Sequence, residues 1–126
     1  MEFPHDQQPA IRVFAMPTDT NSQGDIFGGW MMSQVDVAGS VAAVRRAKGR
    51  VVTVAVNEFL FLKPVFVGDL VSIFSEVTKV GNTSIQVAAH AFSERMFENH
   101  TIIKVAEATL TYVAIDERRR PRPVNG

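Results

Sequence analysis

The sequence contains no cysteine among its 126 residues. This absence excludes disulfide bonds, a thiolate nucleophile and metal sites built from thiolates. The histidines, His5, His90 and His100, are scattered without the spacing of metal ligands, so no metal site is predicted. The chain also lacks a G-x-S-x-G nucleophile elbow, a P-loop and a G-x-G-x-x-G dinucleotide motif. We therefore expect no metal and no redox cofactor.

The chain also lacks a net charge and long apolar runs. The 13 basic and 13 acidic residues balance, which argues against a nucleic-acid partner. No apolar stretch approaches the ~18 residues of a membrane span. The segment Met1–Asp6 lacks the basic residues and apolar run that open a signal peptide. We expect a cytoplasmic protein without a membrane partner.

The length of the chain predicts one domain, residues 1–126, which would gain from self-association because much of its surface stays exposed. Hydrophobic patterning predicts strands over 11–16, 51–62, 70–79 and 102–115, with a further strand after the turn Gly81-Asn82. Strand 51–62 is apolar on both faces, and we expect it to be buried on both. In the last two strands alternate residues are expected to share one face: Ile85, Val87, Ala89 and Ala91, then Ala106, Ala108, Leu110, Tyr112 and Ala114.

A helix is predicted from Trp30 to about Lys48, where a basic residue and a glycine end it. The connections between the later strands are short, which makes neighbouring strands antiparallel. The expected fold class is therefore α+β, with one long helix on a five-stranded antiparallel sheet. Segments 1–9 and 117–126 are predicted to be loose tails.

The segment 21–39 changes from a turn into that helix, and the rest of the chain is organised around it. Small and apolar residues recur at helical spacing and form one stripe: Met32, Val35, Gly39, Ala42 and Ala43. Asp36 falls on the same stripe. A carboxylate on a buried face is costly unless the function requires it, so Asp36 is a candidate base. The alternative is an aspartate that faces solvent or pairs with Arg12 or Arg50.

A glycine pair, Gly28-Gly29, stands where the helix begins. The first N–H groups of a helix lack internal partners and lie at the positive end of its dipole. Glycines let a ligand approach these groups closely, so the pair is a candidate oxyanion hole. The alternative is a flexible entry to the helix. Asp25, just before the pair, is interpreted as a turn or helix-capping residue on residue type alone.

Several stretches resemble the hotdog-fold acyl-CoA thioesterases, and the closest group is the YciA-like, cytosolic acyl-CoA hydrolase branch. They are residues 17–21 and 24–36, which include GDIFGGWMMSQVD, then GRVVTVAV at 49–56, with shorter pieces at 63–64, 67–69 and 80–84. The resemblance covers roughly residues 11–116. It implies a hotdog fold, in which the sheet wraps around the central helix. It also implies a homodimer as the minimal active unit, assembled into a tetramer or hexamer.

The activity implied is hydrolysis of acyl-CoA to a free acid and CoA, without a cofactor, because coenzyme A is part of the substrate. The resemblance makes Asp36 the general base or the nucleophile, and Gly28 and Gly29 the groups that polarise the thioester carbonyl. Asp25 is expected to orient the water or to hold its loop. Asn57 and Glu58 interrupt an apolar strand. In one interpretation, one of the two faces the active site and positions the catalytic water. In the other, they are a polar pair at the edge or end of the strand.

The turn around Asn82 corresponds in the family to a region that contacts the pantetheine or phosphates of CoA, and the residues concerned are Lys79, Asn82, Thr83 and Ser84. A solvated hairpin is the alternative. Related sequences often carry arginine at the position of Asn82. Because asparagine has no positive charge, other residues could contact the phosphates in its place. Arginines at the end of the helix, Arg45, Arg46 and Arg50, are alternative phosphate partners.

Two other functions fit the same fold. One is a hydratase or dehydratase acting on acyl thioesters. Such sites usually place a histidine beside the acid, and no histidine lies near this helix in the sequence. The other is a non-catalytic module that binds acyl-CoA or another apolar ligand.

Overall fold

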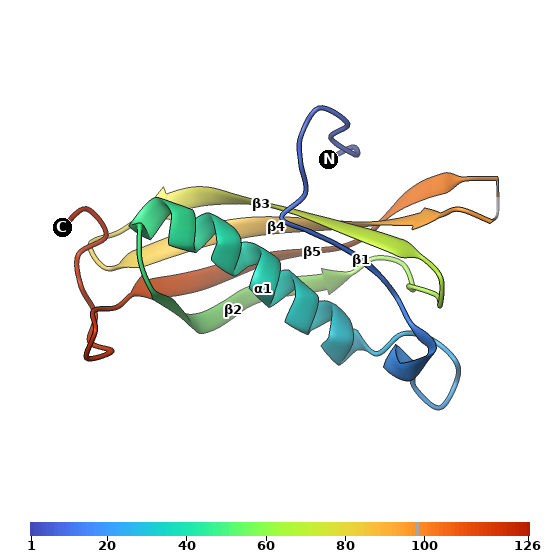
Figure 1. Ribbon diagram of the computed structural model, residues 1–126, viewed down its shortest axis with the longest axis horizontal. Coiled ribbons are helices and arrows are strands. Elements are labelled where there is room, and N and C mark those ends of the chain that lie inside the picture. The colour runs from blue at the N-terminus through green and yellow to red at the C-terminus, as the bar shows by residue number, and fades with distance from the viewer. Residues whose placement is uncertain (98) are drawn as a thin grey trace.

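The computed structural model describes residues 1–97 and 99–126. Within them, five strands form one antiparallel sheet in the order β1-β3-β4-β5-β2. The strands are β1 (Ile11–Phe14), β2 (Val51–Phe61), β3 (Leu70–Val80), β4 (Ser84–Arg95) and β5 (Thr101–Ala114). The helix α1 (Gly28–Ala47) lies across one face of this sheet, and a 3-10 turn, Pro17–Asp19, precedes it (Figure 1). This is the predicted α+β arrangement.

The core fills the space between α1 and the sheet. The alternate residues of β4 and β5 that were expected to share one face point toward the helix and are buried: Ile85, Val87, Ala89 and Ala91, with Ala106, Ala108, Leu110, Tyr112 and Ala114. Because a strand alternates its side chains between two faces, the residues between them form the outer face of the sheet.

The buried face of α1 is rotated slightly from the predicted stripe. Its buried residues are Met31, Val35, Ala38, Gly39, Ala43 and Ala47. Met32, which was assigned to the stripe, is 41% exposed. The helix starts two residues earlier than predicted, so the glycine pair forms its first turn. It ends as expected, with Lys48 in the left-handed conformation (φ 53°) and its N–H bonded to the carbonyl of Val44.

The prediction that β2 is buried on both faces is wrong for the single chain. Among the residues that the structure describes, β2 pairs with β5 alone, so it forms one edge of the sheet. Several of its apolar side chains are exposed, among them Val54 at 55% and Phe61 at 56%. The pairing with β5 also shifts register twice, between Thr53 and Ala55 and between Val56 and Glu58.

Single side chains of the two terminal segments pack against the body of the protein, although most residues of both segments are exposed. Near the start of the chain, the ring of Phe3 contacts those of Phe74 and Phe92 edge-on, with centroids 5.4 Å away in each case. At the other end Val124 is only 4% exposed. The final segment turns back beside the carboxyl end of α1 (Figure 1).

Candidate functional site

The amino end of α1 opens onto a groove of about 330 Å³. Gly28 lies in its wall together with apolar residues from the preceding loop, from the helix, from the end of β2 and the segment after it, and from β5: Ile26, Phe27, Met31, Phe61, Leu62, Val65 and Val105. Phe27 is the N-cap residue and provides no side-chain hydrogen bond to the first turn, which also contains no acidic residue. The positive end of the helix dipole therefore faces the groove without a capping side chain.

The two glycines differ in their surroundings. A Cβ added to Gly28 would lie 3.3 Å from the ring of Phe61, so this glycine allows the ring to pack beside the helix. A Cβ added to Gly29 would meet nothing within 4 Å. Packing within the chain therefore does not explain glycine at position 29, whereas an open approach to the backbone does.

Asp25 lines the same groove but does not cap the helix. The Asx-turn belongs to Asn21, whose Oδ1 accepts hydrogen bonds from the N–H groups of Gln23 and Asp25, at 2.9 and 3.2 Å. The carbonyl of Asp25 in turn accepts from the N–H of Asn21, at 2.7 Å. Asp25 is thus held through its backbone, in the wall of the groove.

Asp36 lies at the border of the buried face of α1, where the helix packs beside β2 and β5. Its Oδ1 accepts a hydrogen bond from the hydroxyl of Thr53, at 2.7 Å. The hydroxyl of Tyr112 lies 2.7 Å from the backbone carbonyl of Asp36 and 3.1 Å from Oδ1. Within the described residues neither Arg12 nor Arg50 pairs with it, which excludes that pairing; Arg12 bonds to Ser72 instead.

Sequence reasoning missed the two hydroxyl groups that hold Asp36. Burial, followed by the negative charge of Asp36 and the hydrogen bond to it, raises the pKa of Tyr112 well above its usual value. Tyr112 therefore remains a protonated donor. A signal was present, since a buried tyrosine usually finds a hydrogen-bond partner. Gly39 makes room for this contact, because a Cβ there would overlap the Tyr112 hydroxyl.

One helix cannot bring the glycine pair and Asp36 together. Asp36 follows Gly29 by seven positions, which at ~1.5 Å per residue separates their backbones by about 10 Å along the axis. Correspondingly, the helix residues that line the groove at the amino end of α1 extend only to Met31, and Asp36 does not line it. Within the single chain, the amino end of α1 and the carboxylate of Asp36 are therefore two separate features.

Comparison with known proteins identifies the family. The model of the thioesterase superfamily matches residues 23–96, which include the groove loop, α1 and β2 to β4. The chain belongs to the thioesterase superfamily. This confirms the predicted family, and the fold and the predicted activity agree with the relatives described next.

Relatives of this thioesterase cover nearly its whole length. The acyl-CoA thioester hydrolase YciA of Salmonella typhimurium is 44% identical over 116 residues, which are 90% of this chain and 87% of the relative. A hexameric hotdog-fold thioesterase of Campylobacter jejuni superposes with a TM-score of 0.90 at 39% identity, covering 95% of this chain and 92% of the other. An acyl-CoA hydrolase of Staphylococcus aureus, solved with butyryl-CoA and CoA, gives a TM-score of 0.82 at 29% identity, covering 90% and 68%.

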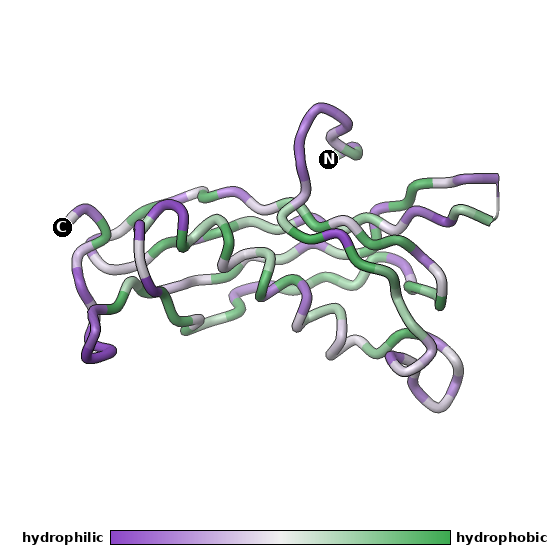
Figure 2. Tube along the Cα trace, viewed as in Figure 1, coloured by the Kyte–Doolittle hydropathy of each residue, from purple (hydrophilic) through white to green (hydrophobic). Residues whose placement is uncertain are grey.

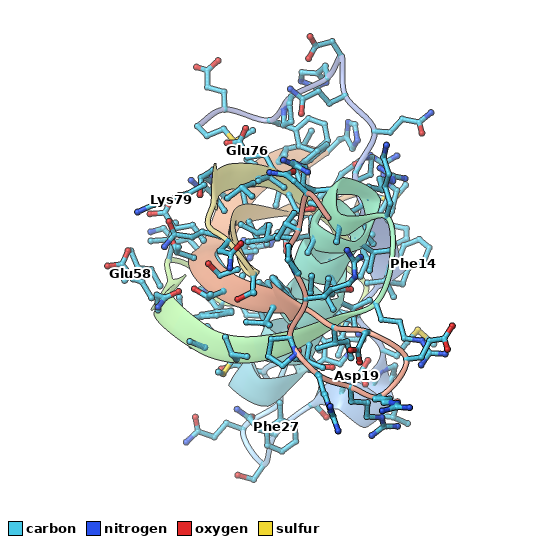
Figure 3. All side chains as sticks on the ribbon, turned by 90° about the vertical axis from the view of Figure 1, so that its left-hand side faces the viewer. Phe14, Asp19, Phe27, Glu58, Glu76 and Lys79 are labelled. Carbon is cyan, nitrogen blue, oxygen red and sulfur yellow. The ribbon has the colours of Figure 1, made fainter. Side chains whose placement is uncertain are left out.

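The residues predicted to contact CoA do not gather around Asp36 in this thioesterase chain. Asn57 accepts a hydrogen bond from Thr111, at 2.7 Å. Because Thr111 and Tyr112 are adjacent in β5, they point to opposite faces of the sheet, so Asn57 lies on the face away from Asp36. Glu58 and Lys79 also lie on the side of the sheet away from α1 (Figure 3).

A second group of predicted residues meets near the carboxyl end of α1 instead. Arg50 precedes β2 there. The turn at Asn82, Thr83 and Ser84 is joined to the final segment, since the carbonyl of Asn82 accepts from the N–H of Val124, at 2.8 Å. The carbonyl of Thr83 accepts from the N–H of Ala114, at 2.9 Å, and that of Ser84 from the N–H of Gly81, at 2.8 Å.

The described residues contain no group of three or more metal-ligating side chains. No helix in the same part of the chain is long and apolar enough to cross a membrane.

Proposed function

We propose that this thioesterase hydrolyses acyl-CoA at a site that combines the amino end of α1 with Asp36. The observation that carries this proposal is the setting of Asp36. Its Oδ1 is engaged by Thr53 and Tyr112, while Oδ2 has no hydrogen-bond partner among the residues described. A carboxylate oriented in this way can receive a proton from water through Oδ2. The apolar groove beside Gly28 suits the acyl group of the substrate.

The chemistry requires one base and one polarising group. Asp36 takes a proton from water as the water oxygen attacks the thioester carbon, and the carbonyl electron pair moves onto its oxygen. The N–H of Gly29 stabilises that oxyanion. The carbonyl then re-forms, the carbon–sulfur bond breaks, and CoA leaves as a thiolate that takes up the proton. In the alternative, the carboxylate of Asp36 attacks the thioester carbon directly, the carbon–sulfur bond breaks with CoA leaving as a thiolate, and water hydrolyses the resulting anhydride.

This geometry requires two subunits. The reacting carbon must lie ~3 Å from the base or its water, and its oxygen ~3 Å from the N–H donor. An aspartate side chain cannot span the roughly 10 Å between Asp36 and Gly29 of one helix. An antiparallel helix from a second copy places its Asp36 beside the first Gly29. A twofold dimer then contains two equivalent sites.

The surface around Asp36 and the amino end of α1 supports this assembly. Apolar side chains are exposed on β2 and on the adjacent face of α1, among them Val37 at 52%, Val52 at 40% and Val54 at 55%. An unpaired edge strand with such side chains is suited to pairing with another strand. The hexameric state of the Campylobacter jejuni relative is compatible with three such dimers. We propose a homodimer as the minimal active unit, built into a hexamer.

The variant Asp36→Asn tests the proposed function. The amide keeps an oxygen to accept from Thr53 and Tyr112, so the fold should persist, but it cannot take the proton. Loss of a general base typically lowers the rate by ~10²–10⁴-fold. We expect CoA release from a panel of acyl-CoA substrates to fall by at least about 100-fold while CoA binding, measured by calorimetry, survives. The exposed Asp6→Asn serves as the matched control.

The same measurement separates the alternatives. Turnover of Asp36→Asn within a few-fold of the wild-type value would remove Asp36 from the mechanism. Wild-type protein that binds acyl-CoA without releasing CoA would be a binding module. Addition of water to an unsaturated acyl-CoA without CoA release would indicate a hydratase. Among the described histidines, His90 lies on β4 and none lies on α1.

A further inference from the structure

The hairpin of β4 and β5 projects beyond the other strands of the sheet (Figure 1). The register of β2 with β5 ends at the pair Phe61–Ala106, and the two backbone bonds beyond it go to the carbonyl of Val105. Among the residues that the structure describes, residues 101–104 of β5 therefore pair with β4 alone. Their other side is an open strand edge, which is suited to contact with another chain.

Apolar side chains are exposed at the same end of the molecule. Phe97, just after β4, is 92% exposed, and Met96 is 45% exposed. In the connection between β2 and β3, Phe66 is 41% and Val67 45% exposed. These four residues, called the hairpin patch below, line one cavity of about 160 Å³. Figure 2 shows hydrophobic colour at the end of β4 and in the connection. Exposed apolar residues that gather in this way mark an interaction site.

Arg95 holds the two parts of the hairpin patch together. Its Nη2 donates to the carbonyl of Pro64, at 2.7 Å, and its Nε lies 3.4 Å from Oδ2 of the buried Asp69. The same Oδ2 accepts from the N–H of Phe66, at 3.0 Å, and the Arg95 guanidinium lies 4.5 Å from the centre of the Phe66 ring. The patch is therefore ordered within the single chain, which lowers the entropic cost of binding a partner.

Assembly beyond a dimer requires a second contact surface on each subunit. A twofold interface uses the same surface on both copies, so the surface of β2 and α1 proposed above is covered once the dimer forms. The hairpin patch lies well away from that surface. Val52 pairs with Val113, which is twelve residues along β5 from Thr101, or about 40 Å at ~3.3 Å per residue. The two surfaces can therefore be occupied at the same time.

The charges of the hairpin patch also favour a copy of this chain over a charged partner. Arg95 and Asp69 form an ion pair with each other, so the patch offers no excess of either sign to an acidic or basic surface. Resting on the assembly proposed above, we propose that the hairpin patch and the open edge of β5 join one dimer to the next in the hexamer. The occupant of the patch is then a second copy of this chain, and Phe97 is its central contact.

A pair of double variants tests this assignment. Met96→Ser/Phe97→Ser removes the most exposed part of the hairpin patch. The matched control, Phe14→Ser/Met16→Ser, removes a phenylalanine and a methionine that are 49% and 53% exposed at β1. Sedimentation equilibrium should give a hexamer for the wild type and for the control, and a dimer for the hairpin variant. Because the proposed active site is complete within a dimer, kcat per chain of the hairpin variant should match the wild type.

Each mass decides for or against the hairpin patch. A hairpin variant that stays hexameric, equal dissociation of both double variants, or a wild type that is itself a dimer would overturn the assignment. The masses are measured without substrate. They therefore decide on the patch even if Asp36→Asn keeps its turnover and the proposed mechanism fails.

The absence of cysteine from the chain allows a second measurement that does not depend on dissociation. Phe97→Cys and Phe14→Cys each introduce a single thiol. In the hexameric fraction, a thiol reagent should modify Phe97→Cys at least about tenfold more slowly than Phe14→Cys, because the neighbouring copy covers position 97. Equal rates of modification would show that position 97 is uncovered and would refute the contact.

Discussion

The hydroxyl of Tyr112 contacts two atoms of Asp36, and the variant Tyr112→Phe removes it with little change of shape. The ring is 0% exposed, so phenylalanine should occupy the same space. The hydroxyl oxygen lies 2.7 Å from the Asp36 carbonyl and 3.1 Å from Oδ1, and its single proton is shared between them. If this contact orients the base, its loss should affect turnover more than folding.

The expected magnitudes follow from those contacts. A hydrogen bond to a charged group contributes about 1.5–3 kcal/mol, and because this one is shared we take the lower end, which corresponds to about a tenfold fall in kcat. The loss to the free energy of unfolding should be about 1 kcal/mol. For a chain of 126 residues this lowers the melting temperature by about 4 °C.

Steady-state kinetics with a saturating acyl-CoA and a thermal melt measure the two effects. Ser75→Ala provides a matched control, because the Ser75 hydroxyl also reaches from a strand to a helix carbonyl, that of Ala38, at 2.7 Å. It should lose similar stability and keep the wild-type kcat. A Tyr112→Phe variant that melts lower but keeps kcat within twofold would refute the positioning role of the hydroxyl.

Two further substitutions follow from the structure. Gly39→Ala should destabilise the protein by about 1–3 kcal/mol and lower kcat, because its Cβ would displace the Tyr112 hydroxyl. An unchanged melting temperature and an unchanged kcat would contradict this. Burial and the charge of Lys104 lower the pKa of His90 below 6.5. As the pH is lowered from 7.5 to 5.5, His90 therefore binds a proton more readily in the unfolded chain than in the folded chain. The free energy of unfolding decreases as the pH is lowered. His90→Gln should reduce this fall in melting temperature, whereas the exposed His5→Gln should not.

Much of the fold could be predicted because its signals are local. The alternation of β4 and β5, and the helical spacing around Val35 and Gly39, reflect burial that each element shows in its own sequence. Asp36 could be singled out for the same reason, as a carboxylate beside that buried stripe. The observed buried face differs from the predicted stripe mainly in including Met31 in place of Met32.

The contacts that depend on distant residues could not be predicted. Tyr112 and Asp36 are 76 positions apart, so no periodicity joins them. The final segment, with its arginines and prolines, has the composition of a free tail, yet Arg122 and Val124 attach it to the helix end and to the turn at Asn82. Side-chain composition indicates flexibility only when such long-range partners are missing.

The exposed β2 shows another limit. Its apolar residues predicted burial on both faces, and the isolated chain leaves Val54 and Phe61 more than half exposed. The composition of a strand can suit contacts made in an oligomer, whereas pairing within one chain leaves β2 at the edge of the sheet. The proposed dimer would reconcile the composition of β2 with its position.

Mixing two inactive variants tests the central claim, that one active site takes Gly29 from one subunit and Asp36 from its partner. Gly29→Val blocks the approach to the helix end, and nothing within 4 Å in the chain should prevent it from folding. Each homodimer, of Asp36→Asn or of Gly29→Val, should be nearly inactive. A mixed dimer holds one site with both defects and one with neither, so an equal mixture, in which half the dimers are mixed, should regain about a quarter of wild-type activity. If mass spectrometry shows that subunits have exchanged and no activity returns, the shared site is contradicted.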